Sequence, residues 1–70
     1  MKKDWYAVSA AVSKDDKLES KFVSISKPMA IRAFSEEEAC GIAIKYLYNE
    51  FPVDDGWQNH SAQAVKVLAT

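Results

Sequence analysis

Cys40 and His60 are the only cysteine and the only histidine in this chain of 70 residues. Nucleophilic catalysis would require the imidazole to lie within hydrogen-bond reach of the thiol. Cys40, however, falls on the apolar stripe of a predicted helix, where a free cysteine ordinarily packs as a small hydrophobic side chain. We therefore predict no catalytic residue and expect that the chain is not an enzyme.

Metal binding is the other chemistry that the residue types allow. Glu50, Asp54 and Asp55 carry oxygen ligands suited to divalent cations, and His60 carries an imidazole. Their spacing matches no recognised metal-binding motif, and the two glycines of the chain stand too far apart to cradle a phosphate. The end of a helix and a turn account for these residues, so we predict no metal site and no cofactor.

The net charge of -1 argues against a polycationic nucleic-acid binder and against a polyanionic mimic of DNA. The charge is unevenly distributed, because residues 1–33 carry a net +3 and residues 34–65 a net -5. The six carboxylates of the second segment lie at the two ends of one predicted helix. They therefore do not form one compact acidic site.

Alternating apolar and polar residues from Trp5 to Ser13 predict a half-buried strand. The polar tetrapeptide Lys14-Asp15-Asp16-Lys17 predicts a hairpin reversal, with a second strand that starts near Glu19. Alternation continues over residues 21–27, with Val23 and Ile25 on one face.

Pro28 has no amide proton, so it must lie at the edge of a sheet or at a bulge. The segment from Met29 to Phe34 then either continues the second strand or forms a short third strand. Both alternatives remain open.

Ser35-Glu36-Glu37-Glu38 predicts a helix start, with Ser35 as N-cap and Glu38 completing a capping box. Pro52 ends the helix, and a loop with an Asp-Gly turn follows over residues 53–57. A last strand from His60 to Leu68 is expected to turn Val65 and Val67 inward. The apolar stripe of the helix comprises Ala39, Cys40, Ala43, Ile44, Leu47 and Phe51, with Glu38, Lys45 and Asn49 on the solvent side.

Gly41 lies inside the predicted helix, where glycine costs stability relative to alanine. It indicates either the close approach of a strand, a second helix or a partner, or a tolerated exposed position.

These elements predict an α+β fold, in which an antiparallel three- or four-stranded sheet packs on one amphipathic helix in the order β-β(-β)-α-β. Residues 1–70 are expected to form a single domain. A chain this short buries only about 60% of the surface that its unfolded form exposes. One cysteine cannot form an intramolecular disulfide, so association is the remaining source of stability.

One helix covers only one face of such a sheet, so the other face is expected to be open. This assignment would invert with a register slip of one residue. We predict that Val8, Val12, Val23, Ile25, Val65 and Val67 face the helix, and that Trp5, Ala7, Ser9, Ala11, Phe22, Ser24, Arg32, Ala64 and Lys66 face away.

The open face is the predicted binding surface, and its partner is either another protein or a second copy in a homodimer. Trp5, Phe22 and Arg32 are the candidate partner-binding residues on this face, because exposed aromatic patches often mark interfaces. The alternative is that Trp5 and Phe22 curl over the edge of the core. Trp57 is a further candidate, which either closes one end of the core or binds a partner from its loop.

Binding of single-stranded nucleic acid is the alternative function. In that case Trp5 and Phe22 would stack on bases. The phosphates would be held by Lys3, Lys21, Arg32 and Lys66.

The start of the chain is basic, but the following apolar stretch is short and contains Ser9. This pattern does not fit a signal peptide. Together with the lone thiol, this pattern predicts that the protein is cytoplasmic and that it does not associate with a membrane.

The segment Ala33-Phe34-Ser35-Glu36-Glu37-Glu38-Ala39, followed by Phe51-Pro52 and Gly56-Trp57, resembles small proteins encoded by phages and mobile elements. The resemblance covers about residues 30–60. Some proteins of that kind are anti-CRISPR or other host-takeover inhibitors, so the resemblance implies binding to a host protein without catalysis. It assigns a role to no particular residue.

Overall fold

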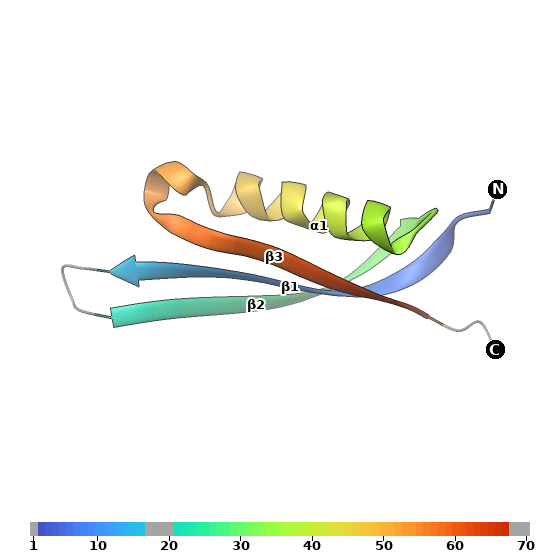
Figure 1. The fold of residues 1–70 in the computed structure, drawn as a ribbon, viewed down its shortest axis with the longest axis horizontal. Helices are drawn as coiled ribbons and strands as arrows, with labels where there is room; N and C mark the ends of the chain where they lie inside the picture. Colours follow the sequence, from blue (N-terminus) through green and yellow to red (C-terminus); the bar gives the residue numbers. More distant parts are fainter. Residues whose placement is uncertain (1, 17–20, 68–70) are drawn as a thin grey trace.

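The computed structural model describes residues 2–16 and 21–67. Its three strands form one antiparallel sheet in the order β2-β1-β3, and the single helix packs on one face of that sheet (Figure 1). The α+β class and the order β-β-α-β are thereby confirmed. The elements are β1 (Asp4–Asp16), β2 (Lys21–Ala33), α1 (Glu36–Glu50), the short 3-10 helix η1 (Val53–Asp55) and β3 (Trp57–Lys66).

The β1–β2 hairpin is longer than the sequence indicates. Its register runs from Asp4 opposite Ala33 to Asp16 opposite Lys21. The predicted turn at residues 14–16 is therefore wrong, because β1 continues there and Lys14 is also paired with Trp57 of β3. Residue 17, the expected strand start at Glu19 and the expected strand end at Leu68 lie outside the described residues.

Pro28 does not divide the second strand. It lies opposite Ser9 within β2, so residues 29–33 belong to the same strand and the sheet has three strands. β2 is an edge strand, the position in a sheet where a missing amide proton is tolerated. Along this edge Pro28 also interrupts the row of backbone donors that another strand could pair with.

The helix α1 begins where the capping signal predicts. The backbone N–H of Glu38 donates to the Ser35 hydroxyl oxygen at 3.1 Å, which confirms Ser35 as the N-cap. At the other end, the Phe51 N–H donates to the Leu47 carbonyl at 2.7 Å before Pro52 stops the helix. Among residues 2–16 and 21–67, no helix has the length and apolar character needed to cross a membrane.

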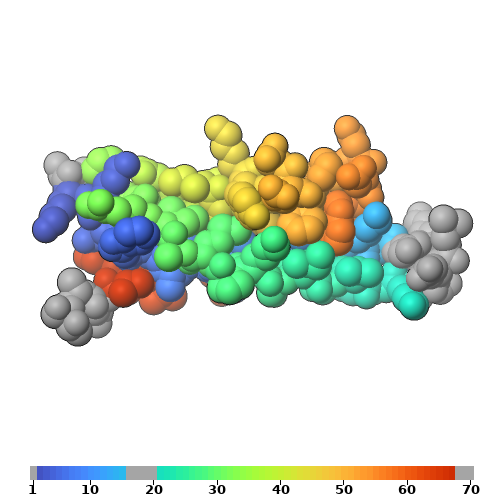
Figure 2. Space-filling view, turned by 180° about the vertical axis from the view of Figure 1, so that it is seen from behind, coloured from blue at the N-terminus to red at the C-terminus, as the bar shows by residue number. Residues whose placement is uncertain are grey.

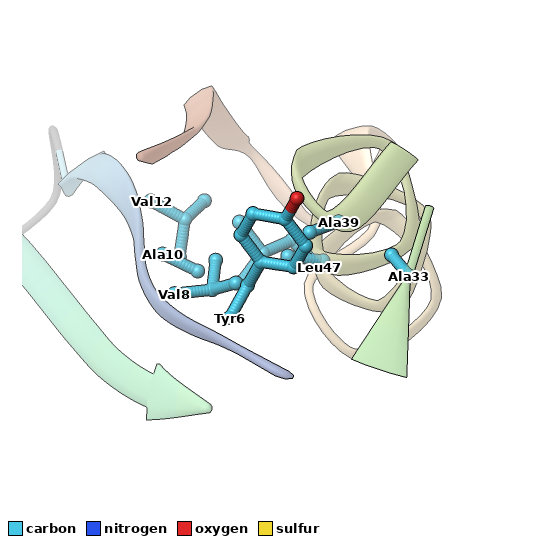
Figure 3. Close-up of a cluster of buried hydrophobic side chains, with 8 residues drawn as sticks. Tyr6, Val8, Ala10, Val12, Ala33, Ala39 and Leu47 are labelled. Carbon is cyan, nitrogen blue, oxygen red and sulfur yellow. The ribbon is translucent and has the colours of Figure 1, made fainter. Parts of the chain in front are cut away.

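The core lies between α1 and the inner face of the sheet (Figure 3). It is thin, because half of the eight buried hydrophobic residues in the described part of the chain are alanines, and the largest fully buried side chains there are Leu47 and Val12. The alanines let the helix backbone approach the sheet closely, but they bury little apolar area. The buried residues are Tyr6, Val8, Ala10, Val12, Ala33, Ala39, Ala43 and Leu47.

A bulge in β3 overturns the predicted orientation of that strand. Ala11 lies opposite Ser61 whereas Ser13 lies opposite Gln58, so β3 has one extra residue at this point. Asn59 takes it up in the left-handed region (φ 59°), where asparagine is among the tolerated residues.

The Asn59 side chain fixes the bulge by donating to the Ser13 hydroxyl at 2.8 Å. Beyond the bulge, from Ser61 onward, each residue of β3 lies on the opposite face of the sheet from the one predicted. Ala62 and Ala64 pack against the core, whereas Val65 and Val67 are exposed. The expectation that Val65 and Val67 face the helix, with Ala64 facing away, is therefore wrong. Lys66, predicted to face away, lies opposite the core residue Tyr6 and so on the helix side.

The molecule is elongated, with principal extents of 48 × 21 × 13 Å. Strands of 13 residues span about 43 Å, whereas the 15 residues of α1 span about 22 Å. The paired ends of β1 and β2 accordingly extend beyond the helix (Figure 1).

The two glycines are expected to respond to alanine in opposite directions. A Cβ atom at Gly41 would meet no described atom within 4 Å, so no strand approaches it, and Gly41→Ala should add about 0.5 to 1 kcal/mol of unfolding free energy. Gly56 has φ +93°, so Gly56→Ala should remove about 1 kcal/mol or more. Urea denaturation at one fixed protein concentration tests both. Equal effects of the two variants would contradict this account.

Candidate functional site

The face of the sheet opposite α1 has no cover within the described part of the chain (Figure 1). We call it the open face. It is formed by alternate residues numbered 5–15 in β1, 22–32 in β2 and 61–67 in and just after β3, and of these only Ser13 at the bulge is buried.

Trp5 and Arg32 are brought together at one end of the open face. They are directly paired across β1 and β2, and the guanidinium lies 6.0 Å from the centroid of the indole ring. Trp5 remains 52% exposed, so it does not curl over the edge of the core. A cation over an exposed indole contributes about 0.5 to 1 kcal/mol, which favours one orientation of the ring.

Val65 and Val67 join Trp5 at this end. Val65 lies opposite Ala7, and the Val67 N–H donates to the Trp5 carbonyl at 2.9 Å. Figure 2 shows the start of β1, the end of β2 and the end of β3 gathered at one end of the molecule. Sequence analysis missed the two valines, and the signal that could have found them is Asn59, a residue type that tolerates the bulge conformation.

The same end contains a hollow of about 240 Å³ beside the indole. Its charged residues are mostly cationic. It is lined by Lys2, Lys3, Asp4, Trp5, Arg32 and Val67.

Phe22 lies at the opposite end of the open face. It is paired with Asp15, ten residues along β1 from Trp5, which corresponds to about 33 Å. Phe22 is 66% exposed. The two predicted aromatic residues therefore share a face but do not form one compact site.

Uncharged and mostly small residues separate the two ends. Ser9 lies between Pro28 and Gln63, and Ala11 lies between Ser26 and Ser61. No aromatic or charged side chain interrupts this stretch, so the middle of the face is low and flat.

Trp57 lies on the other side of the sheet. It starts β3, is half-buried, and meets the Phe51 ring edge-on with 5.0 Å between ring centroids. The Lys14 ammonium lies 5.4 Å from its ring centroid. Trp57 thus packs against the core and shares no surface with Trp5.

Cys40 and His60 make separate contacts. The Cys40 thiol donates to the Ala62 carbonyl at 3.6 Å. The His60 Nε2 is 2.7 Å from the Phe51 carbonyl oxygen, and its ring stacks on Tyr48 at 4.1 Å. The thiol and the imidazole thus each contact a backbone carbonyl of a different residue and do not contact each other through these bonds. Within residues 2–16 and 21–67, no three His, Cys, Asp or Glu residues are grouped so that they could hold a metal ion.

The cations proposed for nucleic-acid binding are dispersed. Lys3 lies over the Phe34 ring at 5.3 Å, and Lys66 forms an ion pair with Asp4 at 3.3 Å. Lys21 is at the far end of the hairpin, next to Phe22. Arg32 lies over the Trp5 ring, and Lys2 and Lys3 line the hollow beside it.

The outer side of α1 carries a second, smaller apolar patch. Ile42, Tyr46 and Tyr48 are between 39% and 50% exposed. The tyrosines already have partners, since Lys27 lies 5.8 Å from the Tyr46 ring and His60 stacks on Tyr48.

No protein family, no curated protein and no solved structure matches this chain.

Proposed function

We propose that the chain is a noncatalytic binding protein whose open face docks onto the surface of another protein molecule. The observation that carries this proposal is the exposed Trp5, which Arg32 holds over an otherwise flat sheet surface. Tryptophan and arginine are enriched among the residues that dominate binding energy, and an ordered side chain loses less entropy on binding.

The composition of the open face supports this function. Trp5, Val65 and Val67 expose apolar area side by side, whereas soluble monomers usually expose large apolar side chains singly. The flat middle, around Ser9 and Ala11, lets a partner surface approach the backbone of the sheet. The thin core gives a further reason, because apolar area covered by a partner adds stability that the monomer lacks.

Inhibition of a host protein is one form of this function. The resemblance to small proteins of phages and mobile elements implies that form. The open face would then cover a functional surface of the host protein, without chemistry of its own.

Single-stranded nucleic acid is the second candidate ligand, and the observation that favours it is the hollow beside Trp5. Lys2, Lys3 and Arg32 line that hollow together with one exposed indole, which is the combination that holds a phosphate next to a stacked base. Phe22 lies too far away to stack on an adjacent base, so this site would hold one or two nucleotides.

Photocrosslinking from the two sides of the molecule tests the proposal. A photoreactive amino acid at Gln63 samples the open face, and the same amino acid at Lys45 samples the exposed side of α1. In cells that produce the protein, we expect Gln63 to give a crosslink to one protein species and Lys45 to give none. Trp5→Ser should abolish the crosslink while leaving the circular dichroism spectrum unchanged.

Equal crosslinking from both positions, or a crosslink that survives Trp5→Ser, would contradict the proposal. A nucleic-acid adduct would favour the second candidate. That reading requires oligonucleotide affinity to fall steeply with salt, because each phosphate contact releases counterions.

A further inference from the structure

The two ends of the open face carry opposite charges. Arg32 accompanies Trp5 at one end, and Asp15 accompanies Phe22 at the other, as the register of β1 with β2 requires. At each end an aromatic ring is thus paired across the two strands with one charged residue, and these two charges differ in sign. Lys2 and Lys3 add to the positive charge beside Trp5.

The midpoint between the ends falls on the smallest residues of the face. Counted along β1 from Trp5 to Asp15, the midpoint lies between Ser9 and Ala11, and across β2 it lies near Ser26 and Pro28. A surface with large residues at both ends and small residues in the middle is suited to another surface of the same shape. Two sheets stack face to face at about 10 Å when their facing side chains are this small.

We propose that the partner of the open face is a second copy of this chain, stacked face to face with its strands antiparallel. A two-fold axis through the midpoint brings the Trp5–Arg32 end of each copy over the Phe22–Asp15 end of the other. Each contact between copies then pairs opposite charges, and by symmetry it occurs twice. This inference rests on the proposed function, because it names the partner of the same face.

The alternative stacking, with like ends together, is disfavoured by charge. It would bring Arg32, Lys2 and Lys3 of one end against the same cations of the second copy. Like charges placed opposite each other in an interface repel and weaken binding.

The surface area of the chain agrees with a second copy. A compact monomer of 7.8 kDa is expected to have an accessible surface of about 4,400 Å². This chain has 5289 Å². The elongated shape accounts for the excess, and it leaves a surface large enough to contribute the roughly 800 Å² that each partner gives to a stable interface of standard size.

A charge exchange tests the pairing. In Arg32→Asp the charged residue paired with the aromatic ring is acidic at both ends of the open face, and in Asp15→Arg it is basic at both ends. Each variant alone should therefore repel itself, and its dimer dissociation constant should rise about tenfold or more. When the two variants are mixed, every contact between unlike copies again joins opposite charges, so a heterodimer should form with an affinity near that of the unaltered homodimer.

Light scattering from micromolar to submillimolar protein gives the masses, and native mass spectrometry with one variant isotope-labelled identifies the heterodimer. Circular dichroism verifies that each variant folds. If either variant does not fold, Arg32→Glu and Asp15→Lys carry the same exchange.

An unaltered chain that stays monomeric at every concentration would overturn the inference. So would a homodimer that both charge variants leave intact, or a mixture that gives no heterodimer. If the chain is monomeric but Gln63 still crosslinks to a different protein in a Trp5-dependent way, the proposed function stands and only the second copy is rejected. If no open-face crosslink to any protein forms, the proposed function fails as well.

Discussion

Replacing Leu47 by alanine should remove about 3 kcal/mol of the unfolding free energy and lower the thermal midpoint by about 15 °C. Leu47 is fully buried and is the largest side chain of the core with no exposed area. A domain of this length has about 4 to 10 kcal/mol in total, so this one side chain accounts for about 30% of it or more. The thin, alanine-rich core leaves few neighbours that could close the cavity.

The matched control is Ile42→Ala in the same helix. Ile42 is 44% exposed, and its truncation should cost less than about 1 kcal/mol. Both variants are compared by urea and thermal denaturation at one fixed protein concentration, since association would make the midpoint depend on concentration. Similar losses in the two variants would show that α1 does not pack through Leu47.

Enlarging Ala43 to leucine should destabilise the fold by about 1 to 3 kcal/mol, although leucine itself favours a helix. Ala43 has no exposed area and lies in the core cluster with Ala10, Ala33 and Ala39. Four alanines at this contact leave no room for a larger side chain, so α1 would have to move away from the sheet.

Lys45→Leu provides the comparison, because it places the same residue on the solvent side of α1. Its unfolding free energy should stay within about 0.5 kcal/mol of that of the unaltered chain. If Ala43→Leu were as stable as Lys45→Leu, the close approach of helix and sheet would be refuted.

Local chemistry made the helix and the first strand predictable. Ser35 and Glu38 specify the helix start through one hydrogen bond between near neighbours, and Pro52 specifies its end through sterics. The alternation along β1 identifies Tyr6 and Val8 as inward residues without any knowledge of the neighbouring strands. These features depend on residues close in the sequence, so sequence alone is sufficient.

The orientation of β3 was not predictable in the same way. Without a bulge, Trp57, Val65 and Val67 share one face, and a strand with that pattern would bury all three. The bulge at Asn59 keeps Trp57 on the helix side while it turns the valines outward. Its stabilising partner is Ser13, which is 46 positions away and comes near only when β1 and β3 pair.

The candidate site was likewise only partly predictable from the sequence. The sequence indicates that Trp5, Phe22 and Arg32 lie on one face, since the period of a strand is enough for that. It does not indicate that Arg32 pairs with Trp5, or that Phe22 lies about 33 Å away beside Asp15. Those facts depend on the hairpin register, and the predicted turn at residues 14–17 would have set a different one.

Pro28 limits how many copies of the chain can assemble. Stacking through the open face uses the same surface on both copies, so it ends with a pair. Growth could continue only sideways, by strands added to the free edges of the sheet, and such growth is open-ended and leads to fibres. Pro28 breaks the backbone pattern in the middle of the β2 edge, opposite Ser9. The proline therefore favours a finite assembly over an unlimited one.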